Sequence, residues 1–330
     1  MMLKNFFLLL TLVLVLSIPT VVSADNLNVP DDYATIQAAV DAAVAVGDVI
    51  VLADQVFNGA GNYDIDFNGK NMTLRSAGLN PEHCIIDCQQ NGRFCQISTA
   101  ENITLEGITV KNGNKVGTSN DAMGGAVFCN STSYLIARHC IFNDNTAGYG
   151  GAVFTSADST FLLSECEFTG NRAGAGGAID NGSFSAIITN CRFNSNSANG
   201  RGGAVYIFAP SSLTTFEKCV FANNSTDANG STHSDGGAVC VLHGITRFTN
   251  CAFIANQVDR RGGAVYTMDI ASFINCTFTL NYANYDGGAV FFSLSKSSED
   301  DVEFKNCILW GDTIPGGGNE ISTFSSSKPH

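Results

Sequence analysis

Short runs of alternating apolar and polar residues cover most of the chain, and two motifs within them recur at nearly constant spacing. Gly-Gly-Ala followed by Val or Ile occurs seven times, at intervals of 25 or 26 residues with one interval of 34. Between these copies, Cys-x-Phe-x-x-Asn occurs six times. Periods of about 20–50 residues are typical of stacked repeats, in which each unit buries its apolar face against its neighbours. The Gly-Gly copies begin at Gly124, Gly150, Gly176, Gly202, Gly236, Gly262 and Gly287.

One period, from Gly176 to Ser197, shows what a single unit contains. Its pattern predicts a strand that starts at Ala178, a turn over residues 180–182, and two further strands over 186–189 and 191–193. Three short strands in about 25 residues, with no helical stretch, indicate a parallel β-helix in which successive coils rise by about 4.8 Å. The fold class is therefore all-β, a parallel β-helix solenoid.

The residue types repeated in each coil suit stacking. Phenylalanine over phenylalanine would form an apolar column, and one cysteine per coil fits a small buried side chain. An asparagine precedes that cysteine in four coils, and we expect these amides to form a hydrogen-bonded ladder along the stack. The four are Asn190, Asn250, Asn275 and Asn306, and the stacked cysteines are Cys140, Cys166, Cys191, Cys219, Cys251, Cys276 and Cys307.

Five of the 12 cysteines fall outside this spacing: Cys84, Cys88, Cys95, Cys129 and Cys240. A Cys84–Cys88 or a Cys88–Cys95 disulfide is compatible with an oxidising compartment, and the sequence leaves both open. No Cys-x-x-Cys pair or histidine cluster accompanies them, so the sequence predicts no metal site.

The N-terminal region differs from the repeats. Residues 31–46 carry apolar side chains at helical spacing, and we expect a capping helix that begins at Asp31 or Asp32 and stops at Gly47. Such a helix would cover the open end of the solenoid. A strand over residues 49–52 follows it.

Five segments are expected along the chain. The N-terminus is typical of a secretory signal peptide, with Lys4, an apolar run over residues 6–16 and small residues before Asp25. The sequence contains no second long apolar run, so we expect no membrane span after cleavage. We expect Trp310 to plug the last coil and residues 225–235 to form an inserted loop. The segments are a signal peptide (1–24), an N-terminal cap (25–46), irregular coils (47–123), regular repeats (124–312) and a flexible tail (313–330).

Charge narrows the possible partners. The formal net charge is −13, whereas binding to phosphate backbones requires a basic surface. The sequence therefore argues against a nucleic-acid partner. Carbohydrates and cell-surface proteins remain the expected partners of a secreted solenoid.

The alternating Gly-Gly-Ala-Val/Ile and Phe-x-x-Asn motifs of residues 124–292 resemble the repeats of the chlamydial polymorphic outer-membrane proteins. Residues 29–39 resemble the opening of many secreted right-handed β-helix proteins related in fold to pectate lyases. The resemblance implies a right-handed helix, an extracellular or outer-surface location, and an adhesin-like role.

A candidate binding feature follows the Ala-Val step of the repeats. Aromatic residues occupy this position in five coils, and Asp180 and Cys240 occupy it in the other two. If the valine faces inward, the aromatic rings face outward and form a stripe suited to sugar rings or to a protein. The alternative is that the rings pack inward at the corner. The stripe consists of Phe128, Phe154, Tyr206, Tyr266 and Phe291.

No catalytic set of residues stands out in the sequence. Asp235 and Asp286 both precede Gly-Gly, but Arg261 holds that position in the coil between them, and no two carboxylates recur at one position in adjacent coils. We therefore expect a secreted, non-catalytic adhesin or binding surface that needs no cofactor. The alternative is a polysaccharide lyase or glycoside hydrolase of the pectate-lyase-like fold, and only this alternative would involve calcium.

Overall fold

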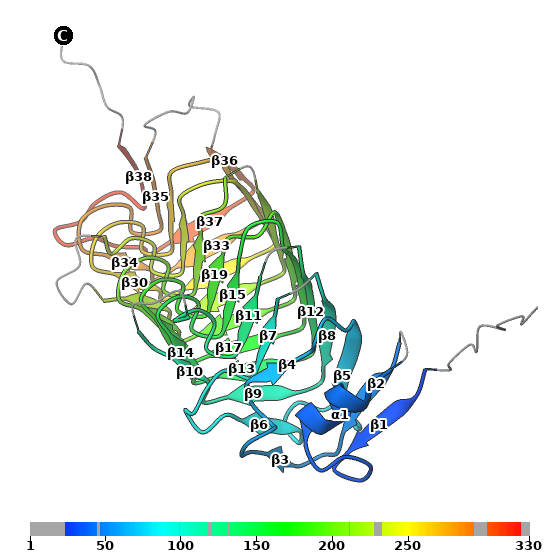
Figure 1. Cartoon of the computed structure of the whole chain (residues 1–330). Helices are drawn as coiled ribbons and strands as arrows, with labels where there is room; N and C mark the ends of the chain where they lie inside the picture. The colour runs from blue at the N-terminus through cyan, green and yellow to red at the C-terminus, as the bar shows by residue number, and fades with distance from the viewer. Residues whose placement is uncertain are drawn as a thin grey trace, which may run out of the picture.

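Every strand of the described chain pairs in parallel with strands one coil away, in register. The computed structural model describes residues 24–44, 47–98, 100–117, 121–130, 132–210, 212–227, 233–293 and 302–324. Figure 1 shows these coils stacked along one axis, with the N-terminal elements at one end and β36 and β38 at the other. The expected parallel β-helix is confirmed.

Four sheets run along the solenoid. Sheet A consists of β1 (Asn26–Val29), β2 (Val49–Leu52), β5 (Met72–Ser76), β8 (Asn102–Glu106), β12 (Tyr134–Arg138), β16 (Thr160–Ser164), β20 (Ser185–Thr189), β24 (Leu213–Glu217), β28 (Ile245–Thr249), β32 (Ala271–Ile274) and β36 (Val302–Lys305). Sheet B consists of β3 (Val56–Phe57), β6 (Ile85–Asp87), β9 (Thr109–Lys111), β13 (Ile141–Asn143), β17 (Glu167–Thr169), β21 (Arg192–Asn194), β25 (Val220–Ala222), β29 (Ala252–Ile254), β33 (Thr277–Thr279) and β37 (Ile308–Trp310). Sheet C consists of β4 (Ile65–Asp66), β7 (Cys95–Ile97), β11 (Val127–Cys129), β15 (Val153–Thr155), β19 (Ile179–Asn181), β23 (Val205–Ile207), β27 (Val239–Val241), β31 (Val265–Thr267), β35 (Val290–Ser293) and β38 (Ile321–Phe324). Sheet D consists of β10 (Asn114–Lys115), β14 (Thr146–Ala147), β18 (Arg172–Ala173), β22 (Ser197–Ala198), β26 (Ser225–Thr226), β30 (Gln257–Val258) and β34 (Tyr282–Ala283).

Two details of the predicted coil are wrong. A regular coil has a fourth, two-residue strand in sheet D. Asp180 and Asn181, expected in a turn, lie in β19, where Asp180 is the register partner of Phe154 and Tyr206. Pairing on both sides fixes these residues as strand although their local preference is for turns.

The predicted phenylalanine column is confirmed. Neighbouring rings from Phe142 to Phe278 in sheet B are stacked with centroids 4.7–5.0 Å apart. A second column in sheet A runs from Phe216 to Phe304 with centroids 4.8–5.0 Å apart. Buried aromatic pairs of this kind stabilise beyond their area alone, so the two columns form the core of the regular coils.

A buried asparagine ladder is present, but the prediction that Asn190, Asn250, Asn275 and Asn306 form it is wrong. Asn190 and its equivalents are exposed, with φ near +54° at the corner between sheets A and B. His139, Glu165 and Lys218 hold the same corner in other coils, so it requires left-handed backbone and not an amide. Three of the expected residues still form exposed hydrogen bonds of 3.2 and 3.3 Å, linking Asn250, Asn275 and Asn306.

The buried ladder is formed by the asparagine that ends each Cys-x-Phe-x-x-Asn motif. Each Nδ2 donates to Oδ1 of the next coil and to a backbone carbonyl of the preceding coil, which belongs to Val110 for Asn145 and to a phenylalanine for the others. The same Oδ1 of the next coil also accepts the backbone N–H of the asparagine. Every side chain of the ladder is buried, so these bonds satisfy groups that water cannot reach. The members are Asn145, Asn171, Asn196, Asn224, Asn256 and Asn281.

Asp312 ends this ladder and lacks the donor that the other members have. Its Oδ1 accepts the backbone N–H and Nδ2 of Asn281 at 2.8 and 2.7 Å. Its Oδ2 is buried without a hydrogen-bond partner, at the place where asparagine would carry Nδ2. Burial raises the pKa of Asp312, although the hydrogen bonds from Asn281 oppose the shift.

We expect Asp312→Asn to raise the melting temperature at pH 7.5 and to have little effect near pH 3. Because folding raises the pKa of Asp312, its neutral form stabilises the fold. This contribution is complete below the unfolded-state pKa of 3.8 and is lost as the pH rises through the folded-state pKa. The amide restores a donor at all pH values, worth about 1 kcal/mol. Thermal melts at the two pH values measure this, and an equal gain at both would contradict it.

The N-terminal cap is α1 (Ile36–Ala42), which contacts β1, β2 and β4. Its apolar face is buried as expected, but its predicted ends are wrong. Thr35 is the N-cap, with its hydroxyl accepting from the amide of Ala38 at 3.2 Å, while the Asp32 carboxylate accepts from Asn28. The helix ends at Ala42, because Ala43 adopts an extended ψ of 129°.

All 12 cysteines are free thiols, so neither expected disulfide is present. Cys84 was expected to fall outside the stacked cysteines, but it occupies the same repeat position. Ile85 pairs with Thr109 and Thr109 with Ile141, so Cys84 lies two coils before Cys140. The sequence missed this because the coils before residue 124 differ in length.

The far end of the solenoid also differs from the prediction. Trp310 is 74% exposed and is not a plug, because strand alternation turns Leu309 toward the core and Trp310 outward. Residues 321–324, within the segment expected as a flexible tail, form β38 and pair with β35.

Some predictions fall outside the described residues. These are the expected signal peptide up to residue 23, residues 228–232 of the inserted loop, and residues 325–330 of the expected tail. No helix among the described residues is long and apolar enough to cross a membrane.

Candidate functional site

The aromatic stripe lies on the outer side of sheet C. Val127 and Cys129 of β11 are part of the core, so Phe128 between them points to the opposite side. Cys240, Tyr266 and Phe291 likewise form a hydrophobic cluster of their own, separate from the core. In-register pairing places the middle residues of the strands in one row, the outer row of sheet C: Asp66, Gln96, Phe128, Phe154, Asp180, Tyr206, Cys240, Tyr266 and Phe291.

Most of the stripe is nevertheless covered. Phe154, Tyr266 and Phe291 are 6%, 6% and 1% exposed, whereas Phe128 and Tyr206 are half-buried. Arginine side chains provide part of the cover. Cζ of Arg261 lies 4.9 Å from the ring centroid of Phe291, and Cζ of Arg93 lies 5.2 Å from the ring centroid of Phe128. The outer row therefore offers two accessible rings and not a continuous aromatic surface.

A second row runs beside the first and consists of the residues that precede Gly-Gly. Four of them alternate in charge along the axis through parallel bridges: Arg201, Asp235, Arg261 and Asp286. The glycines set this arrangement. Gly202 has φ +64°, and a Cβ there would collide with the carbonyl oxygen of Val205. The turn returns the chain into β23, so Arg201 and Tyr206 line the same cavity.

Asp180 is the most unusual member of the outer row. It is 1% exposed, and its Oδ1 has no hydrogen-bond partner. Its register neighbours are Phe154 and Tyr206. Burial raises the pKa of Asp180 well above its usual value, because removal from water disfavours the charged carboxylate. Burial therefore favours the neutral carboxylic acid form of this side chain.

Asp235 is a buried carboxyl in a different electrostatic setting. Its Oδ2 lies 3.5 Å from Nη1 of Arg260, and its Oδ1 has no partner. Burial raises the pKa of Asp235, but Arg260, Arg261 and Arg201 oppose the shift. Burial raises the pKa of both carboxyls, and neighbouring arginines oppose this shift only at Asp235. The two groups thus differ in their electrostatic setting, as in sites where one carboxyl acts as acid and the other as base.

Two further polar groups complete the cluster. Burial raises the pKa of Tyr206 to about 12, with Arg201 opposing this increase and Asp180 adding to it. Nε of Arg201 is buried without a partner. Asp180, Arg201 and Asp235 each therefore contribute an unsatisfied buried atom to one face of the molecule. Such atoms are uncommon in folded proteins, and each calls for an explanation such as a bound ligand or a catalytic role.

A cavity of about 400 Å³ opens beside this cluster. Arg201 and Tyr206 form part of its wall, and the exposed His233 lies at its edge. A molecule in the cavity would contact Arg201 and Tyr206, one strand away from Asp180. The remaining lining residues are Tyr149, Gly174, Ala175 and Gly200.

A second cavity, of about 270 Å³, lies at the N-terminal end of the outer row, beside Asp66 and Gln96. Its charges are paired with one another. Arg93 lies 3.0 Å from Asp121, and Lys115 lies 3.7 and 3.8 Å from Asp64 and Asp121. This network is a weaker candidate, because its carboxylates already have partners.

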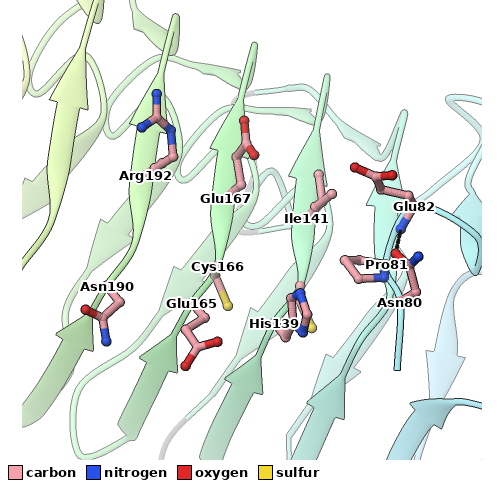
Figure 2. Close-up of a pocket in the computed structure, with 11 residues that line it drawn as sticks. Asn80, Pro81, Glu82, His139, Ile141, Glu165, Cys166, Glu167, Asn190 and Arg192 are labelled. Atoms are coloured by element: carbon pink, nitrogen blue, oxygen red, sulfur yellow. Dashed lines mark hydrogen bonds between the residues drawn. The ribbon is translucent and has the colours of Figure 1, made fainter. Parts of the chain in front are cut away.

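A third cavity, of about 300 Å³, lies on the corner between sheets A and B (Figure 2). His139 and Glu165 occupy the left-handed corner positions, and Glu167 and Arg192 follow on sheet B. Glu82, whose amide donates to Asn80 at 3.0 Å, completes its wall. None of the polar lining side chains is buried, so these groups keep contact with water. No group of three His, Cys, Asp or Glu side chains suited to a metal ion occurs among the residues that the structure describes.

The sequence pattern predicted that aromatic residues gather on one side of sheet C, but it did not single out the buried polar groups of that side. In the sequence, Asp180 interrupts the aromatic stripe, and no two carboxylates share one repeat position in adjacent coils. Asp180 and Asp235 hold different positions, one in each row, and only the turn at Gly-Gly brings the two rows together. The available signal was an aspartate at a position that five of the seven regular coils fill with an aromatic residue.

Comparison with known proteins supports the fold. The profile of the family described as "Right handed beta helix region" matches residues 126–323. No curated protein matches the chain. This match shows the right-handed β-helix but not the resemblance to the chlamydial repeats.

Two solved structures resemble the chain. The pectin methylesterase from Aspergillus niger, in deglycosylated form, is 13% identical, with 95% of this chain and 93% of that chain covered and a TM-score of 0.46. A mutant of the PL6 family alginate lyase AlyGC is 14% identical, with 91% of this chain and 53% of that chain covered and a TM-score of 0.33.

Proposed function

Since the chain belongs to the right handed β-helix family, we propose that the outer face of sheet C binds a polysaccharide and hydrolyses its glycosidic bonds. The observation that carries this proposal is Asp180, a buried carboxyl without a hydrogen-bond partner for Oδ1. An acid kept neutral by burial is the form that a glycosidic oxygen needs as proton donor.

The two carboxyls have complementary roles in this proposal. Asp180 donates its proton to the leaving glycosidic oxygen as the bond to the anomeric carbon breaks. Asp235, held toward its charged form by the arginines around it, accepts a proton from the water that attacks the same carbon. Arg201 lies beside the cavity and stabilises negative charge on the polar groups of the substrate.

The shape of the face suits a chain-like substrate. The two rows run parallel to the solenoid axis over many coils, so successive sugar units would meet repeated positions. The accessible rings of Phe128 and Tyr206 offer apolar surfaces of the kind that pack against sugar rings. Secretion, expected from the N-terminal sequence, would bring the protein to extracellular polysaccharides.

A second candidate function is non-catalytic binding at the same face, to carbohydrate or to a cell-surface protein. The half-buried rings of Phe128 and Tyr206 favour it, because neither ring is needed for acid–base chemistry. Under this function Tyr206→Ala weakens retention on the ligand, and the protein has the adhesive role implied by its repeats. Tyr266→Ala would not test binding, since the Tyr266 ring is buried and its loss would destabilise the fold.

A panel of polysaccharides, with and without calcium, separates these functions when retention and bond cleavage are measured in the same samples. New reducing ends support hydrolysis, whereas new unsaturated ends would indicate elimination and contradict the assigned roles of Asp180 and Asp235. Retention without cleavage supports the binding function. Neither retention nor cleavage on any polysaccharide would contradict a carbohydrate-directed role and leave protein binding.

A further inference from the structure

The two ends of the solenoid are closed differently (Figure 1). At the N-terminal end, α1 packs its apolar face against the first coil. At the other end, sheets A, B and C stop at β36, β37 and β38, each of which pairs on one side only among the described residues. An unpaired strand edge exposes hydrogen-bonding groups that can pair with another chain.

The last coil also exposes part of the core. Phe273, Cys276 and Phe278 are buried in the preceding coil. Their register equivalents, Phe304, Cys307 and Leu309, are only half-buried and pack against the core from one side. The C-terminal end therefore combines open strand edges with an apolar surface.

We propose that this end binds the same end of a second copy of the chain, by antiparallel pairing of β36 with the partner's β36 about Phe304. The carbonyl of Lys305 accepts from the amide of Asn275 at 2.8 Å, so Lys305 faces β32. Backbone groups alternate in direction along a strand, so the N–H and C=O of Phe304 face the open edge. Two copies of Phe304 can then exchange both hydrogen bonds across a two-fold axis.

Charge complementarity selects this register. Pairing about Phe304 places Glu303 opposite the partner's Lys305, and the arrangement occurs twice because of the two-fold axis. The side chains of Glu303 and Lys305 are 45% and 61% exposed and already form an ion pair within the strand. In antiparallel strands, the residues next to a hydrogen-bonded pair form non-hydrogen-bonded pairs, whose side chains lie closer together. Opposite charges in such a pair stabilise the strand pairing, and like charges destabilise it.

The same pairing continues the aromatic column. Phe304 stacks on Phe273 at 4.8 Å between ring centroids, and the partner's Phe304 would add the next ring on the open side. This contact uses the same edge of both copies, so the pairing closes at two copies and leaves no C-terminal edge for a third. The inferred partner is therefore a second copy in a closed dimer, not a growing fibre.

Sedimentation velocity of the purified protein over a concentration series tests this inference. We expect a dimer for the wild type. Lys305→Glu places four carboxylates at the two-fold axis, and Glu303→Lys places four ammonium groups there, so each variant should weaken the dimer at least about tenfold. The double variant Glu303→Lys with Lys305→Glu restores opposite charges and should dimerise like the wild type.

A mixture of the two single variants is the sharpest control. Neither variant pairs well with itself, but a copy with two glutamates complements a copy with two lysines at both contacts, so mixing them should restore the dimer. Circular dichroism should show that all variants fold, because both side chains are exposed. A monomeric wild type at about 100 μM, a dimer unaffected by Lys305→Glu, or no recovery on mixing would each overturn the proposal.

Discussion

Asp180→Asn is expected to reduce polysaccharide cleavage by about 10²–10⁴-fold without lowering the melting temperature. The amide has nearly the shape of the acid but cannot donate a proton to a glycosidic oxygen. The wild-type carboxyl is buried and lacks a partner for Oδ1, so the fold gains nothing from its charge. Reducing-end assays on the best substrate of the panel, together with thermal melts, measure the two effects.

The pH dependence adds a second test of the same residue. Because the pKa of Asp180 is raised, the acid form required for catalysis is lost only as the pH rises through that higher value, which sets the alkaline limit of activity. Stability follows the same sign. The contribution of neutral Asp180 to the stability of the fold is complete below the unfolded-state pKa of 3.8, and it disappears as the pH rises through the folded-state pKa. Asp180→Asn should remove this dependence.

Asp66→Asn is a matched control for Asp180→Asn. Asp66 lies in the same outer row at the N-terminal end, but it is exposed and accepts a hydrogen bond of 2.8 Å from the amide of Asn68. Its substitution should leave cleavage within about twofold. Equal losses in both variants would show that Asp180 has no special role, and a loss of folding in Asp180→Asn would assign it to stability.

Asn196→Ala is expected to destabilise the protein by about 4 kcal/mol. Its Oδ1 accepts the backbone N–H and Nδ2 of Asn171 at 3.0 and 2.9 Å, and its Nδ2 donates to the carbonyl of Phe168 at 2.9 Å. Alanine leaves these buried groups without partners and leaves a void in the ladder. Denaturant unfolding measures the change through the shift of the midpoint.

Asn190→Gly is the comparison for Asn196→Ala. Asn190 lies six residues earlier, at an exposed corner with φ +54° that glycine adopts without strain. We expect a change within about 0.5 kcal/mol. If the two substitutions had equal effects, the buried ladder would not be the main polar support of the coils.

The repeat sequence was sufficient to predict the architecture. The recurrence of Gly-Gly-Ala-Val and Cys-x-Phe-x-x-Asn predicts one coil per period, and the alternation around Phe193 identifies which side chains stack in the core. These predictions succeeded because they depend on local alternation and on a single repeat length, both of which can be counted along the chain. The helix at residues 36–42 was found for the same reason, although Thr35 and not an aspartate caps it.

The sequence could not assign the ladder. Asparagine recurs at two positions of the coil, one that requires left-handed backbone and one that requires a buried amide. Asparagine suits both positions, so the residue type does not tell them apart. Only the packed coil shows that Asn190 points to solvent and Asn196 into the stack.

The sequence by itself determined the solenoid, its period, its core columns and the face on which aromatic residues gather. Only the folded chain shows which of those rings are covered and that Asp180 lies in the outer row while Arg201 and Asp235 lie in the row beside it. These three residues come from successive coils, so their arrangement depends on the turn at Gly-Gly and on the register between coils, which local alternation does not encode. The raised pKa of Asp180 follows from the burial that this packing creates.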